Sequence, residues 1–82
     1  MEWLLIGILV LNPTTGKGVP RVTIACEGEY QTGFVEVQET DSRGYFVISV
    51  QPGPHQCVAK KNGSSVLFTV DGKDVVVGFE VL

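Results

Sequence analysis

Positive charge is scarce in this chain of 82 residues, where six Lys and Arg residues face nine Asp and Glu residues and the net charge is −3. A protein that holds a polyphosphate backbone needs clustered Lys and Arg residues. Here the basic residues are scattered, apart from the pair Lys60 and Lys61. We therefore expect no nucleic-acid partner.

Residues that carry catalysis or bind metals are equally few, with one histidine and two cysteines. The sequence has no HxxxH, CxxC or GxSxG arrangement. Two thiolates alone do not complete a zinc site. The turn at Asp41 supplies one carboxylate, whereas a calcium ion takes about six to eight oxygen ligands. We expect no catalytic residue, no metal and no cofactor.

A small hydrolase is the alternative that this composition leaves open. It would use His55 as a general base beside Asp41 or Glu39, with a hydroxyl group from Ser42 or Ser49. A lone histidine at an inward strand position is more often a packing residue, so this alternative ranks last.

Long apolar runs are absent, and the stretch from Trp3 to Leu11 has nine residues where a membrane-spanning helix needs about 20. Glu2 stands where a signal peptide carries positive charge, and no small-residue cleavage site follows. We interpret the stretch as a strand and expect no membrane insertion. The compartment is unknown: cytoplasmic by default, and extracellular or cell envelope if the chain is part of a longer secreted protein.

Helical periodicity is missing as well, whereas short β-branched runs recur about every ten residues between Gly, Pro, Asn and Asp. This rhythm predicts a single domain over residues 1–82 with an all-β fold: a seven-stranded antiparallel Greek-key sandwich of the immunoglobulin or prealbumin-like kind. Hairpin turns are expected at Asn62-Gly63 and Asp71-Gly72. The expected strands are Leu4–Leu11, Val19–Glu27, Phe34–Thr40, Tyr45–Val50, His55–Lys60, Ser65–Val70 and Val75–Val81.

Alternation within these strands predicts which side chains face the core. The outward set includes Arg21, Thr23, Ala25, Tyr45, Val47 and Ser49. The inward set includes Ile6, Ile8, Val10, Val22, Ile24, Cys26, Val35, Val37, Phe46, Ile48 and Val50.

Two stretches resemble the carboxypeptidase regulatory-like (prealbumin-like) domain family. In residues 10–24, a strand ends at Asn12, a Thr-Gly turn follows, and the next strand enters through an apolar pair. In residues 40–59, an acidic Gly turn, an aromatic strand, a Pro-Gly turn and an alternating strand follow one another. The family commonly has Asp at the position of Asn12 and Tyr at that of His55. The resemblance implies a seven-stranded sandwich that serves as an accessory, adhesive or carrier-binding module.

Cys26 and Cys57 fall on inward positions of strands that are neighbours in such a fold. A cross-strand disulfide is therefore geometrically possible. Two buried free thiols are the other possibility, because cysteine is often buried as a small apolar residue and a chain without a signal peptide defaults to a reducing compartment.

The first strand is apolar on both faces, because its outward positions include Trp3, Leu5, Leu9 and Leu11. An antiparallel sandwich normally leaves one face of each strand to water. Either the chain's own loop at 28–33 covers these side chains, or a protein partner or a second copy does. We favour a non-catalytic structural or protein-interaction module that acts through this strand as a homo-oligomer or as a subunit of a larger assembly.

The last expected strand, Val75–Val81, is apolar on both faces too and lacks edge charges, so sheet extension between copies is available if it lies at an edge. A different class of function is a carbohydrate- or small-ligand-binding sandwich, in which Tyr30 from the 28–33 loop and Tyr45 from a strand would stack on a sugar ring.

Overall fold

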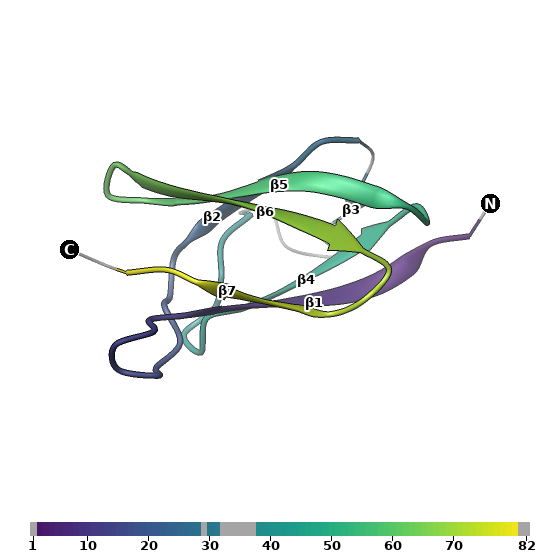
Figure 1. Cartoon of the computed structure of the whole chain (residues 1–82). Coiled ribbons are helices and arrows are strands. Elements are labelled where there is room, and N and C mark those ends of the chain that lie inside the picture. The colour runs from purple at the N-terminus through teal and green to yellow at the C-terminus, as the bar shows by residue number, and fades with distance from the viewer. Residues whose placement is uncertain (1, 29, 32–37, 81–82) are drawn as a thin grey trace.

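The computed structural model describes residues 2–28, 30–31 and 38–80, and within these the chain is all-β, with two sheets and no helix. The four-stranded sheet has the order β3-β4-β1-β7 and the three-stranded sheet the order β2-β5-β6. The two sheets form two layers (Figure 1). The strands are β1 (Leu4–Leu11), β2 (Thr23–Cys26), β3 (Tyr30–Gln31), β4 (Tyr45–Val50), β5 (Pro54–Lys61), β6 (Ser64–Asp71) and β7 (Val75–Gly78).

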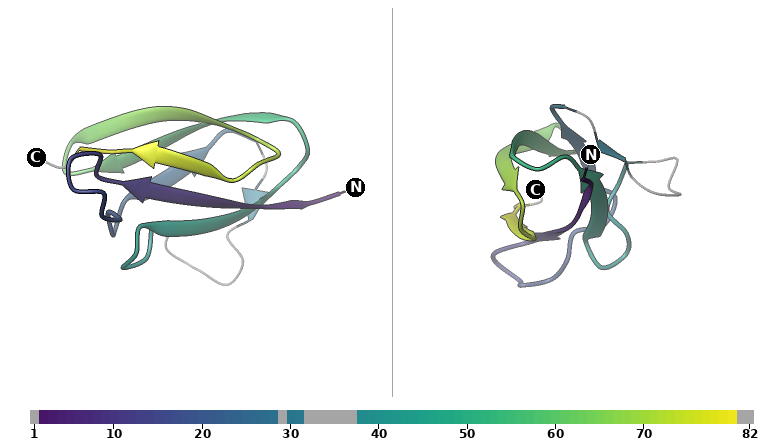
Figure 2. Two further views of the ribbon diagram at one scale, coloured as in Figure 1. Left: turned by 60° about the horizontal axis from the view of Figure 1, so that its bottom comes forward. Right: turned by 90° about the vertical axis from the view of Figure 1, so that its right-hand side faces the viewer.

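Strand β1 lies inside the four-stranded sheet and pairs on both sides. It is antiparallel to β4, with Leu4 opposite Val50, and parallel to β7, with Ile8 beside Val75. The expected purely antiparallel sheet is therefore wrong at this pair. The reason is that β7 follows β6 from the other layer and enters the four-stranded sheet beside β1 in the same direction, as Figure 2 shows.

The two expected hairpin turns have different outcomes. Asn62 and Gly63 adopt φ values of 51° and 82° and join the antiparallel neighbours β5 and β6, as a type I′ turn requires. Asp71 has no positive φ, although Gly72 has one of 70°. The Asp71-Gly72 segment therefore does not form a hairpin but carries the chain from β6 in one sheet to β7 in the other.

The core lies between the two layers and follows the expected alternation. Val22, which precedes β2, and Ile24 within β2 belong to one buried cluster with the inward residues of β1 and β4. The predicted inward positions Val35 and Val37 lie outside the described residues. The buried apolar residues are Ile6, Ile8, Val10, Val19, Val22, Ile24, Phe46, Ile48, Val50, Cys57, Ala59, Val70, Val77 and Phe79.

The expected strand Val19–Glu27 is interrupted, and only Thr23–Cys26 pairs with β5. Val19 still lies beside the four-stranded sheet, because its N–H donates to the carbonyl oxygen of Val10 in β1 at 2.8 Å. Arg21 then adopts a φ of 57°, a left-handed conformation that turns an L-residue chain sharply. The segment thus crosses from one sheet to the other at Arg21.

Buried Thr40 holds this crossing in place. Its hydroxyl group donates to the carbonyl oxygen of Val19 at 2.7 Å and accepts from the N–H of Val22 at 2.9 Å. These bonds pair backbone groups that would otherwise be buried without partners, which costs free energy. The expected strand Phe34–Thr40 lies mostly outside the described residues. In its described part, Glu39 forms an isolated bridge with Thr23.

Two glycines allow the turn after Thr40 to pack against the end of β1. Gly44 has a φ of 81°, and its carbonyl oxygen accepts the N–H of Val10 at 2.8 Å. A Cβ atom on Gly44 would lie 2.7 Å from the backbone nitrogen of Val19 and 2.8 Å from Cα of Gly18. Backbone therefore touches backbone here, and no room remains for a side chain.

Candidate interaction surface

The outer face of the four-stranded sheet carries a continuous set of apolar side chains. The register places Leu9 of β1 between Tyr45 of β4 and Val76 of β7. Leu5 is 77% exposed and Val76 is 63% exposed. Val47, opposite Gly7, is exposed on the same face. We call this set, Leu5, Leu9, Tyr45, Val47 and Val76, the outer apolar face.

The four residues predicted for interaction do not share one environment. Leu5 and Trp3 are exposed, whereas Leu9 and Leu11 are half-buried. Leu9 is shielded because it has a neighbouring strand on each side, and Leu11 lies near the end of β1 with Gly78 and Gly18 as its backbone partners. The prediction omitted Val47 and Val76. Alternation already placed Val47 outward, but only the parallel pairing shows that Val76 continues the same row.

The ring of Tyr45 lies across Gly7, the one position of β1 in the outer row that has no side chain. A Cβ atom on Gly7 would meet the hydroxyl oxygen of Tyr45 and would lie 2.8 Å from Cζ. The hydroxyl end of the ring therefore lies against the backbone of Gly7, where a side chain at position 7 would have no room. The side chain of Tyr30, the other residue of the ligand-binding alternative, lies outside the described residues.

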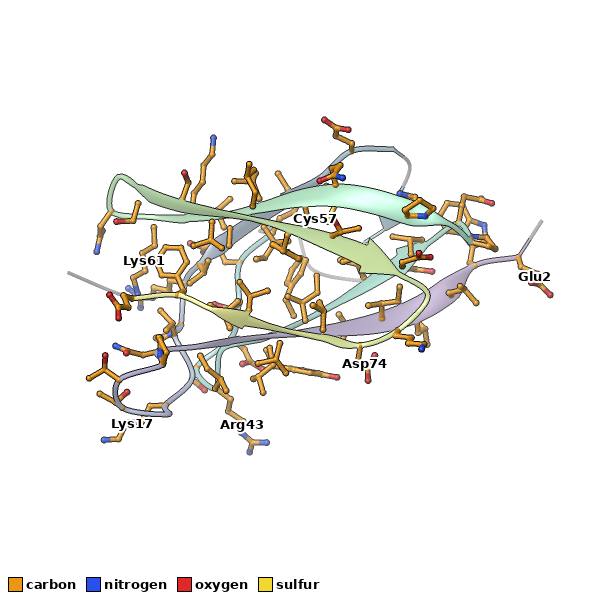
Figure 3. All side chains as sticks on the ribbon, in the orientation of Figure 1. Glu2, Lys17, Arg43, Cys57, Lys61 and Asp74 are labelled. Atoms are coloured by element: carbon orange, nitrogen blue, oxygen red, sulfur yellow. A yellow bond between two sulfur atoms is a disulfide. The ribbon has the colours of Figure 1, made fainter. Side chains whose placement is uncertain are left out.

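Asp74 completes the edge of this face. Its carboxylate accepts the N–H of Gly7 at 2.8 Å, just before β7 begins to pair with β1 at Val75 and Ile8. The backbone donor of Gly7 is thus satisfied by a side chain where the neighbouring strand has not yet started. Asp74, labelled in Figure 3, places one negative charge at the border of the outer apolar face.

The loop expected to cover the first strand does not do so in its described part. Tyr30–Gln31 forms β3, which pairs with β4 and lies on the side of β4 away from β1. Gly28 lies against the ring of His55 instead. The remaining loop positions, 29, 32 and 33, are outside the described residues. Within the described chain, the outer apolar face has no covering segment.

His55 joins two backbone segments. Its Nδ1 lies 3.1 Å from the carbonyl oxygen of Glu27, and its Nε2 lies 2.8 Å from that of Gln51. Both partners are carbonyl oxygens, and which ring nitrogen donates depends on the tautomer. These contacts fit a residue that ties the end of β2 to the turn before β5.

The residues of the hydrolase alternative are not brought together. Asp41 lies in the turn before β4, where its N–H donates to the carbonyl oxygen of Tyr45, the first residue of that strand. His55 follows the end of β4, a strand of six residues that spans about 17–20 Å. Ser42 belongs to the turn of Asp41, whose Arg43 lies in the half of the molecule away from Glu2 in Figure 3.

Glu39 and Ser49, the other residues of the hydrolase alternative, also lie away from His55. Glu39 bridges Thr23, which pairs with Lys60. Lys60 is five positions along β5 from His55, a distance of about 16 Å. Ser49 is half-buried at an outward position of β4, opposite Leu5.

Asp41 organises its own turn and has a perturbed acidity. Its carboxylate accepts N–H groups from Tyr45 at 3.0 Å and from Arg43 at 2.8 Å. These hydrogen bonds, with the positive charge of Arg43, hold the pKa of Asp41 below its ordinary value of 3.8.

We expect acid to weaken this turn. A carboxyl group whose pKa is lower in the folded chain than in the unfolded chain stabilises the fold above the unfolded pKa, and the contribution is lost as pH falls through the folded-state pKa. As the pH is lowered below about 4, the free energy of unfolding should therefore decrease. The decrease should be smaller in Asp41→Asn, because the amide oxygen of asparagine still accepts the two N–H groups and does not titrate. Urea unfolding at pH 7, 4 and 2.5 measures this, and equal slopes in both proteins would contradict it.

Cys26 and Cys57 form a disulfide. They are direct partners in the antiparallel pair of β2 and β5, with Cα atoms 4.0 Å apart. The N–H of Glu27 donates to the carbonyl oxygen of Gln56, so the neighbouring cysteine pair is a non-hydrogen-bonded pair, in which the strands approach most closely. Of the two possibilities that the sequence leaves open, the structure contains the cross-strand bond.

Two kinds of feature are absent from the described residues. No group of three or more His, Cys, Asp and Glu residues in ranges 2–28, 30–31 and 38–80 is arranged to hold a metal ion. No helix in these ranges is long and apolar enough to cross a membrane.

Comparison with known proteins yields no match to a family model, to a curated protein or to a solved structure. The resemblance to carboxypeptidase regulatory-like domains therefore depends on the turn and strand motifs of the sequence alone.

Proposed function

We propose that this chain is a non-catalytic protein-interaction module that binds a protein partner through the outer apolar face. The observation that carries the proposal is the row Tyr45–Leu9–Val76 together with the exposed side chain of Leu5. These residues form a patch on the order of a few hundred Å², the size at which exposed apolar surface marks interaction sites.

The chemistry of the face favours a protein over a sugar or an ion. Aliphatic side chains dominate it, its aromatic ring covers Gly7, and its bordering charge is the carboxylate of Asp74. Leu5 and Val76 can enter a partner's apolar pockets, and Asp74 can form part of a polar rim. We propose further that the chain is a seven-stranded Greek-key sandwich of the carboxypeptidase regulatory-like type, which would fit such an accessory role.

Dye binding tests this face without knowledge of the partner. Under native conditions and at concentrations where light scattering shows a monomer, anilinonaphthalene sulfonate should bind the protein. The variant Leu5→Ser/Val76→Thr should lose more than half of the fluorescence. Leu67→Ser removes a leucine of similar exposure, 80%, from the other sheet and should retain most of it. Equal losses in the two variants, or no dye binding by the parent protein, would remove the proposal.

A further inference from the structure

A second surface lies on the other sheet, at the free edge of β6. Strand β6 is eight residues long and terminates the three-stranded sheet, with β5 as its only strand partner in the described chain. The opposite edge of this sheet is occupied, because the N–H of Ile24 in β2 donates to the carbonyl oxygen of Gln38 at 2.9 Å. Of these two edges, β6 is the open one.

The hairpin determines which backbone groups of β6 point outward. A two-residue loop makes Lys61 and Ser64 a hydrogen-bonded pair, and bonded pairs then recur at every second residue. Val66 and Phe68 therefore bond to β5. On the other side of β5, the N–H of Glu27 donates to the carbonyl oxygen of Gln56. The backbone groups of Gln56 therefore point toward β2 and away from β6, which agrees with this alternation. The N–H and C=O groups of Ser65, Leu67 and Thr69 consequently point away from the sheet.

The edge lacks the features that discourage strand addition. Natural edge strands carry lysine, proline, a bulge or an inward charge. From Ser64 to Val70 there is no charged residue and no proline, and the register with β5 is uninterrupted by a bulge. Strand β7, by comparison, has only four residues.

The side chains of this sheet form an apolar row that ends at the open edge. The register aligns Ala25 of β2, Val58 of β5 and Leu67 of β6. Leu67 is 80% exposed, the highest value among the exposed large apolar residues of the described chain. The flanking positions Gln56 and Thr69 are polar, and their side chains contact each other at 3.4 Å.

We propose that two copies of this chain pair through β6, antiparallel about a two-fold axis at Leu67. Each Leu67 then lies opposite Leu67 of the second copy, and each Ser65 lies opposite Thr69 of the second copy. The pairing supplies about six backbone hydrogen bonds and opposes no like charges. It also joins the two apolar rows into one across a continuous sheet of both copies, which is why we assign the edge to a second copy.

Charged substitutions of Leu67, at the two-fold axis, test this register. Leu67→Lys and Leu67→Glu each place like charges directly opposite one another and should weaken dimerisation at least about tenfold. An equimolar mixture of the two variants should recover it, because Lys then faces Glu. Val76→Lys, on the outer apolar face, is the matched control and should dimerise like the parent protein. Sedimentation velocity over a dilution series measures the parent protein and these four samples.

Three results would contradict pairing through β6 or move it to another surface. A parent protein that stays monomeric up to millimolar concentration overturns the proposal, as does a mixture that fails to recover dimerisation. Loss of dimers in Val76→Lys but not in Leu67→Lys would move self-association to the outer apolar face, which is the surface of the proposed function and is judged separately by dye binding.

Hydrogen exchange provides a readout that does not depend on a variant. The amides of Ser65, Leu67 and Thr69 should exchange more slowly as protein concentration rises, because the second copy bonds them. The amides of Val66 and Phe68, already bonded to β5, should change much less. Concentration-independent exchange at the first three amides would contradict the pairing.

Discussion

Replacing Gly44 by alanine should cost about 4 kcal/mol of folding free energy, combining about 1–2 kcal/mol for an L-residue in a left-handed conformation with the cost of overpacking. The new Cβ atom would meet the carbonyl oxygen of Val10 and lie 2.7 Å from the nitrogen of Val19. These are backbone atoms at the end of β1 and in the crossing segment, so relief requires moving a strand. A chain of 82 residues has about 4–12 kcal/mol of stability in total.

Gly63→Ala is the matched control for this variant. Gly63 has a φ of 82°, close to the 81° of Gly44, but a Cβ atom there would have no atom within 4 Å. It should therefore lose only the conformational part, about 1–2 kcal/mol. Urea unfolding followed by tryptophan fluorescence measures both. Equal losses of unfolding free energy in the two variants would contradict the role of close backbone packing at Gly44.

Breaking the disulfide should lower the free energy of unfolding by about 3–4 kcal/mol, the loop-closure value for a loop of this length. The two cysteines are 31 positions apart in the sequence. The effect arises mainly in the unfolded chain, which gains freedom when the loop opens. The unfolding midpoint of the parent protein in urea should therefore fall when a reducing agent is added.

The double variant Cys26→Ala/Cys57→Ala separates the cross-link from packing. Cys57 is buried and Cys26 half-buried, so the alanines also remove apolar contacts. Its midpoint should be insensitive to reducing agent. Thiol titration of the denatured, unreduced parent protein should find no free thiol, and two thiols per chain would rule the cross-link out.

Alternation of apolar residues predicts much of this fold because it reports directly on burial. The bounds of β1 and β4 are as expected, and the inward positions of both strands are buried. Alternation says which face a residue occupies but not which strand lies beside it. The parallel neighbour β7 therefore could not be found in this way, and neither could the place of Val76 on the outer apolar face.

Local turn signals are reliable only where the local conformation decides the outcome. Asn62-Gly63 can adopt two successive left-handed residues and does so. Asp71-Gly72 has similar residues but serves a crossing between layers, because packing places β7 in the other sheet. The break at Arg21 and the hydrogen bonds of Thr40 depend on segments about 20 residues apart, which no local pattern reveals. The state of the two cysteines could not be predicted either, because inward positions on neighbouring strands are compatible with a disulfide and with two free thiols.

The parallel alignment of the first and last strands has a mechanical consequence. The chain enters at one end of the molecule and its last described residues lie at the other (Figure 1). Tension between these ends would pull β1 and β7 in opposite directions along their length. Their four register pairs, with the further bond from Phe79 to the carbonyl oxygen of Leu11, would then be loaded together in shear instead of opening one after another like a zip.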